Sequence, residues 1–133
     1  MAPHPFYPTN VALKKSLYEN IDLFDAIEMS WFWTQKTDFN RKAKEAALKY
    51  NKPYLATSDT HSLKYLDRAY ALVDAKEKET EAILEAIKNG KFKNFSLPLK
   101  KRELLKAEAL ILRCYFGGRL KNFKNAVLAK KNN

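Results

Sequence analysis

Apolar and polar positions follow two different patterns over most of the chain. Short apolar runs bounded by polar residues predict strands over 21–29, 54–57, 69–73 and 92–96. Between these runs, apolar residues recur at three- and four-residue steps. This spacing predicts a short helix up to Tyr18 and longer helices over 39–50 and 81–88. Strands that alternate with helices indicate βαβ units, so we expect an α/β fold in which 54–57 and 69–73 are adjacent parallel strands.

Both longer helices carry start and stop signals. We expect Asp38 to cap the helix over 39–50, and Asn51-Lys52-Pro53 to end it. We expect Thr80 to cap the next helix, which Asn89-Gly90 ends. These signals support the helix boundaries independently of the apolar periodicity.

The pattern becomes purely helical in the last third of the chain, where Gly117-Gly118 separates two predicted helices. The charge balance changes in the same region. Residues 1–87 contain 12 Lys and Arg against 13 Asp and Glu, whereas residues 88–133 contain 13 against two, a net charge of +11. We therefore expect an α/β domain over 1–97 and a basic helical extension over 98–133.

Composition narrows the class of protein further. The single cysteine, Cys114, excludes an internal disulfide and suits a reducing compartment. The apolar runs, such as the one at 109–112, are far too short to span a membrane, and the amino-terminal segment lacks the apolar core of a signal peptide. We therefore expect a soluble cytoplasmic protein that does not associate with membranes.

The most informative motif is Ser58-Asp59-Thr60-His61, which directly follows the predicted strand 54–57. Asp59 and His61 are two residues apart, so in an extended segment their side chains point to the same side. A carboxylate and an imidazole at the end of a strand are a recurrent pair of metal ligands. The other histidine, His4, lies in a second segment of loop character. The alternative for Asp59 and His61 is a loop in which the aspartate caps a turn.

The order of the motifs resembles the PHP (polymerase and histidinol phosphatase) superfamily over residues 2–95. His4-Pro5 is followed by Asp25-Ala26-Ile27-Glu28, by the Ser-Asp-Thr-His motif, and by a helix ending in Ala-Ile-Lys-Asn-Gly-Lys. The resemblance implies a distorted seven-stranded β/α barrel that binds two or three divalent metals and hydrolyses phosphate esters. It also implies that His4, Asp59 and His61 are ligands of zinc or manganese, and it places Glu28 near the site.

One part of the family pattern is missing. PHP proteins open with a His-x-His strand, followed by further histidines and a bridging glutamate, whereas this chain has two histidines in total. The chain therefore resembles the carboxyl-terminal half of a PHP domain, an incomplete barrel of about four parallel strands with a helical extension. We expect a truncated protein or a second chain that supplies the amino-terminal half, and homo-oligomers that cover the open barrel edges. We also expect weak metal binding and little phosphoesterase activity in the isolated chain.

Two further features each have two interpretations. Trp31-Phe32-Trp33 would line a substrate mouth or stack on bases, or, as we expect, form an exposed apolar patch that packs against the missing half of the barrel. The basic residues of the extension would bind nucleic acid in a catalytically silent PHP relative, or form a solvated helix face, which we favour. The nucleic-acid candidates are Lys100, Lys101, Arg102, Lys106, Arg113 and Arg119.

Overall fold

The computed structural model describes residues 1–9, 12–59, 63–109 and 112. The chain forms two compact units, Met1–Leu99 and Lys100–Asn133. In the second unit, residues 101–109 are helical, and the Lys100 N–H donates to the Glu103 carboxylate at 2.9 Å, which caps the helix start. The helix predicted beyond Gly118 lies outside the described residues, so the domain boundary stays a prediction.

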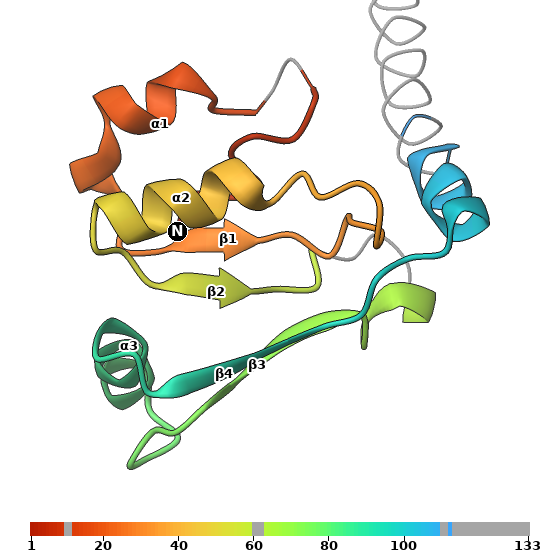
Figure 1. Ribbon diagram of the computed structural model, residues 1–133. Coiled ribbons are helices and arrows are strands. Elements are labelled where there is room, and N and C mark those ends of the chain that lie inside the picture. The colour runs from red at the N-terminus through yellow and green to blue at the C-terminus, as the bar shows by residue number, and fades with distance from the viewer. Residues whose placement is uncertain (10–11, 60–62, 110–111, 113–133) are drawn as a thin grey trace, which may run out of the picture. The chain divides into compact units, whose positions relative to one another are not determined.

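The first unit is a mixed α/β structure with two small sheets (Figure 1). Its elements are, in chain order, α1 (Lys15–Glu19), η1 (Ile21–Leu23), β1 (Ile27–Met29), α2 (Arg41–Lys49), β2 (Tyr54–Ala56), η2 (Leu63–Tyr65), β3 (Ala69–Val73), α3 (Thr80–Lys88) and β4 (Phe92–Ser96). The predicted α/β class is therefore confirmed. A closed barrel is not formed by the described residues.

Parallel pairing organises the amino-terminal sheet. β1 and β2 pair in parallel, from Ile27 opposite Tyr54 to Met29 opposite Ala56. On the other side of β1, Ala2 forms a parallel bridge with Ile27. Three chain segments, at Ala2, β1 and β2, thus run in one direction, and their carboxyl ends lie at the same edge.

The core of the first unit lies between this sheet and the helices. The apolar stripe of α2 is made of small residues, Ala43, Ala46 and Ala47, which allows the helix to approach β1 closely at Ile27. Leu17 of α1 completes the cluster. Figure 1 shows α2 lying along β1 and β2.

The second sheet differs from the prediction. β3 and β4 have the predicted bounds, but they pair antiparallel with each other, from Ala69 opposite Ser96 to Val73 opposite Phe92. β3 does not pair with β2, so the prediction of adjacent parallel strands over 54–57 and 69–73 is wrong. The physical reason is visible in the burial. Tyr70 and Leu72 are exposed while Ala69 is buried, and a sheet with one solvated face is typical of antiparallel pairing.

The element boundaries also differ in detail. The predicted strand over 21–29 divides into η1 and the shorter β1. Asp38 does not cap α2 directly. Its carboxylate accepts a hydrogen bond from the Asn40 N–H at 2.8 Å, and Asn40 is the residue that precedes the helix. Thr80 is the first residue of α3 rather than its cap.

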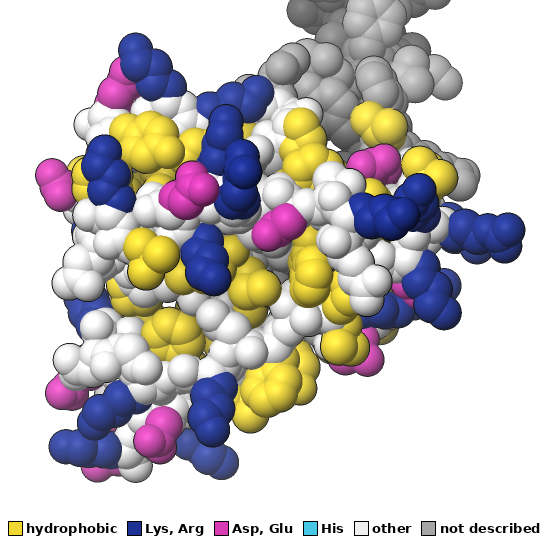
Figure 2. Space-filling view, in the orientation of Figure 1, with side chains coloured by type: hydrophobic (Ala, Val, Ile, Leu, Met, Phe, Trp, Pro, Cys, Tyr) yellow, Lys and Arg dark blue, Asp and Glu magenta, His cyan; other side chains and the backbone are white. Residues whose placement is uncertain are grey.

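The surface of the first unit is mixed in character. On the face shown in Figure 2, hydrophobic side chains lie exposed between charged side chains, among which Lys and Arg outweigh Asp and Glu. Among the described residues, none of the helices combines the length and apolar character needed to cross a membrane.

We predict that Ile27→Ala destabilises the first unit strongly, because the Ile27 side chain is 0% exposed and packs under α2. Ile to Ala in a core costs about 2–5 kcal/mol of unfolding free energy, which urea denaturation followed by circular dichroism would measure. Leu48→Ala is the control, since Leu48 of α2 is 75% exposed. Equal losses in both variants would contradict the placement of the core.

Candidate metal site

The candidate ligands lie at the carboxyl ends of the parallel segments. His4 follows Ala2, Glu28 is in β1, and Thr57 and Asp59 follow β2. Side chains alternate between the two faces of a strand, so Ile27 packs against α2 while Glu28 points to the opposite face. Parallel pairing therefore gathers these residues at one edge of the sheet.

Glu28 joins the three segments through its carboxylate. The side chain is only 1% exposed. Its Oε2 accepts the backbone N–H of His4, and its Oε1 accepts the hydroxyl of Thr57. A buried carboxylate is stable only when its oxygens are hydrogen-bonded, and here both are. Glu28 thus fixes both His4 and the chain that leads to Asp59.

His4 and Asp59 face each other. The imidazole Nε2 of His4 lies 3.5 Å from Oδ2 of Asp59, and the two side chains are 30% and 42% exposed. The other ring nitrogen, Nδ1, is buried and has no hydrogen-bond partner. His61 lies outside the described residues.

Both of these residues have an unusual backbone conformation. φ is 23° at His4 and 34° at Asp59, in the left-handed region that residues other than glycine rarely adopt. Such conformations cost free energy and are concentrated at functional sites. The other non-glycine residues with positive φ in the described part of the chain are Lys14 and Asn51.

The donor set fits part of a metal site. Two ligands about 2.1 Å from a tetrahedral zinc ion are separated by about 3.4 Å, and the His4 and Asp59 donor atoms are 3.5 Å apart. In the described part of the chain, however, no three His, Cys, Asp or Glu side chains gather closely enough to hold a metal. Two donors are fewer than the three protein ligands of a catalytic zinc site.

Tyr54 of β2 is the neighbouring residue with a shifted pKa. Burial raises the pKa of the Tyr54 phenol, and the Asp38 and Glu28 carboxylates raise it further. The phenol therefore stays protonated even in moderately alkaline solution.

The aromatic segment after β1 is placed differently from the prediction. Trp31 and Phe32 are buried, so the predicted exposed patch is wrong. The Trp31 ring stacks on Tyr65 of η2, with ring centroids 5.0 Å apart. The Phe32 ring meets Tyr7 edge-on at 5.2 Å. These contacts attach the loop that follows β1 to one segment earlier in the sequence, at Tyr7, and to one later in it, at Tyr65.

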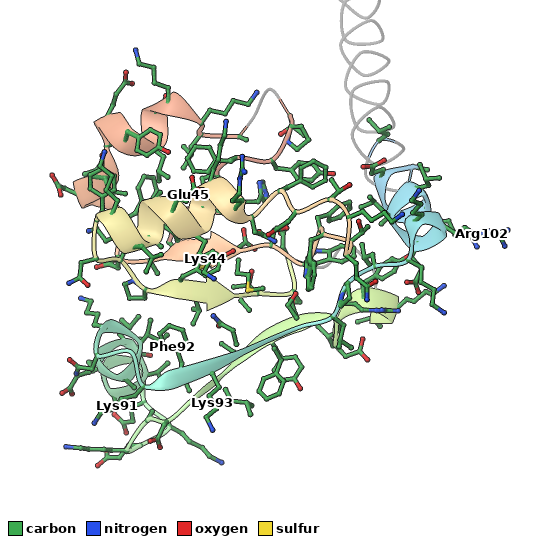
Figure 3. All side chains as sticks on the ribbon, in the orientation of Figure 1. Lys44, Glu45, Lys91, Phe92, Lys93 and Arg102 are labelled. Atoms are coloured by element: carbon green, nitrogen blue, oxygen red, sulfur yellow. The ribbon has the colours of Figure 1, made fainter. Side chains whose placement is uncertain are left out.

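The basic candidates lie in the second unit. Lys100, Lys101, Arg102 and Lys106 are exposed, and Figure 3 labels Arg102. Arg113 and Arg119 lie outside the described residues. Binding of nucleic acid by this segment stays a prediction.

The structure adds one residue beside the candidate ligands that the motifs did not indicate. Thr57 links β2 to Glu28 through its hydroxyl. The signal in the sequence is the position of Thr57 in the alternation of side chains along the strand. Thr57 is two residues after Leu55, which lies opposite Glu28, so Thr57 and Glu28 project from the same face of the sheet.

We predict that Glu28→Leu destabilises the first unit by about 1–3 kcal/mol, since the His4 N–H and the Thr57 hydroxyl lose their acceptor. Glu28→Gln should cost less, because the amide oxygen can accept from His4 while the amide nitrogen donates to the Thr57 hydroxyl.

Urea denaturation would measure both variants against Glu45→Leu as control. Glu45, labelled in Figure 3, is exposed on α2 and pairs with Arg41 one helical turn away. A Glu28→Leu variant as stable as wild type would disprove the bridging role.

Comparison with known proteins bears on the same region. A model of the PHP-associated family (PHP_C) matches residues 37–92, from the turn before α2 to the start of β4. Comparison with curated proteins and with solved structures gives no significant match. The matched segment includes β2 and Asp59 but not His4 or Glu28. The predicted resemblance is therefore confirmed at the level of the family: residues 37–92 match the PHP-associated family model, which is consistent with the carboxyl-terminal region of a PHP-superfamily protein.

Proposed function

We propose that the chain contributes part of the metal centre of a PHP-type phosphoesterase, with His4, Asp59 and His61 as ligands of one divalent ion. The observation that carries the proposal is the approach of His4 Nε2 to Asp59 Oδ2, at 3.5 Å, from the ends of two different segments. Both residues have positive φ, which fits residues held for a function rather than for packing. His61 enters from the sequence motif alone.

A divalent ion in such a centre activates a water molecule and polarises the phosphoryl oxygens. In this chain, Glu28 would hold the backbone of His4, and Thr57 would hold the chain before Asp59. Each oxygen of Glu28 already accepts a hydrogen bond from a segment that carries a candidate ligand, so the proposed role of Glu28 is to orient the ligands.

The proposal includes a second polypeptide segment. Three ligands satisfy one catalytic ion at most, and PHP chemistry uses two or three ions. We propose that Ala2, β1 and β2 are an edge of a larger β/α barrel, and that another chain or a second copy supplies the remaining ligands. Zinc and manganese are the proposed ions, and a phosphate ester is the proposed substrate.

Titration with Zn²⁺ and Mn²⁺ tests the proposal. We expect one weakly bound ion per chain, and a loss of affinity of about 10- to 100-fold or more in His4→Ala, Asp59→Asn and His61→Ala, because loss of a ligand costs at least as much as loss of its supporting partner. Phosphatase activity of the isolated chain should be close to background, since the ligand set is incomplete.

Asp22→Asn serves as the control, because Asp22 is an exposed carboxylate in η1. Affinity that is unchanged in all three ligand variants would exclude this site. Activity at ordinary enzyme rates in the isolated chain would show that no second segment is required.

A further inference from the structure

The edge of β2 that faces away from β1 is hydrogen-bonded by a side chain, the carboxamide of Asn94. In β2 and its flanks, the odd-numbered residues direct their backbone N–H and carbonyl groups toward β1. The Ile27 N–H, for example, donates to the Pro53 carbonyl at 2.8 Å. Tyr54 and Ala56 therefore direct their backbone groups to the opposite edge. There the Ala56 N–H donates to Asn94 Oδ1 at 2.9 Å, and Asn94 Nδ2 donates to the Tyr54 carbonyl at 2.7 Å.

This arrangement repeats the pattern of a parallel strand. On the far side of β1, the Ala2 N–H donates to the Ala26 carbonyl at 2.8 Å, and the Ala2 carbonyl accepts the Glu28 N–H at 3.0 Å. Ala2 thus bridges positions on either side of Ile27 with its backbone. Asn94 bridges positions on either side of Leu55 in the same sense, but with its carboxamide.

We propose that Asn94 is a positioning residue for the metal site, because its carboxamide replaces a neighbouring strand and holds the carboxyl end of β2. The inference rests on the proposed function. Ala56 is directly followed by Thr57, and Asp59 comes two residues later, so the bond to the Ala56 N–H lies close to both. Glu28 holds Thr57 from the β1 side, and Asn94 holds β2 from the other.

β4 is anchored well enough to serve this purpose. Asn94 lies in the middle of β4, opposite Ala71 of β3. Two residues further, the Ser96 hydroxyl accepts a hydrogen bond from the Trp33 indole N–H at 2.7 Å. The Leu99 N–H donates to the Trp33 carbonyl at 2.8 Å. The segment that carries Asn94 is therefore attached to the loop after β1 as well as to β2.

The competing explanation is that Asn94 only stabilises the fold. A structural role would lower the unfolding midpoint and leave the folded site unchanged. A positioning role would change the site in molecules that are still folded. The two explanations are separated by measuring the site well below the unfolding midpoint of each variant.

The experiment compares Asn94→Leu and Asn94→Asp with Lys93→Leu in the full chain. Leucine removes both hydrogen bonds, and aspartate keeps the acceptor for the Ala56 N–H while losing the donor to Tyr54. Lys93, labelled in Figure 3, is the preceding residue of β4, and its side chain projects from the opposite face. It is thus a matched control for a change of composition in this strand.

Two readouts are taken at the same temperature. Calorimetry with Zn²⁺ should show an affinity about tenfold weaker in Asn94→Leu, intermediate in Asn94→Asp and unchanged in Lys93→Leu. Without metal, nuclear magnetic resonance should show faster amide exchange at Ala56 and shifted amide signals of Thr57 and Asp59 in Asn94→Leu.

Each outcome decides the matter. Wild-type zinc affinity together with unshifted Thr57 and Asp59 signals in Asn94→Leu would overturn the positioning role, whatever happens to the midpoint. If the wild-type chain binds neither zinc nor manganese, the proposed function fails. The amide signals of Thr57 and Asp59 then test whether Asn94 positions this segment. Shifted signals in Asn94→Leu support that role, and unchanged signals reject it. If Asn94→Leu does not fold, Asn94→Asp is judged by the same criteria.

Discussion

The buried carboxylate of Glu28 is the interaction on which the first unit depends. A charged group with 1% exposure is costly unless its oxygens find donors. Here the donors come from the two flanking segments, the His4 backbone and the Thr57 hydroxyl. The folded chain must bring three strand ends together to satisfy one side chain. The same requirement places His4 and Asp59 across from each other, so the stability of this region and the geometry of the candidate site have a common origin.

Much of the secondary structure could be predicted from the sequence. The strands over 69–73 and 92–96 were predicted with the observed bounds, α2 lies inside the predicted helix over 39–50, and α3 begins one residue before the predicted helix over 81–88. These elements have clear local signals, because apolar periodicity and the residues at helix ends depend on the chain nearby. Glu28 and His4 could be placed near the site only through the order of the motifs, since no local rule brings together residues 24 positions apart.

Other features could not be predicted, because they depend on contacts between distant segments. The run Ala-Tyr-Ala-Leu-Val of β3 has the composition of a buried parallel strand, but its direction is set by its partner β4. The Trp31 and Phe32 side chains were predicted to be exposed, yet they pack against Tyr65 and Tyr7. Asn94 is a polar residue in a short strand, and the pattern does not distinguish a solvated amide from one that pairs with another strand.

The Asn94 carboxamide also decides on which side the parallel sheet can grow. Because the Tyr54 carbonyl and the Ala56 N–H are already bonded to Asn94, an incoming strand cannot use these two groups to pair with β2. The opposite side of the sheet ends at the segment of Ala2. There the next residue, Pro3, has a carbonyl but no N–H to offer. Any polypeptide that enlarges this sheet would therefore have to add from the Ala2 side. There its N–H can donate to the Pro3 carbonyl, but its own carbonyl opposite the Pro3 nitrogen would find no donor.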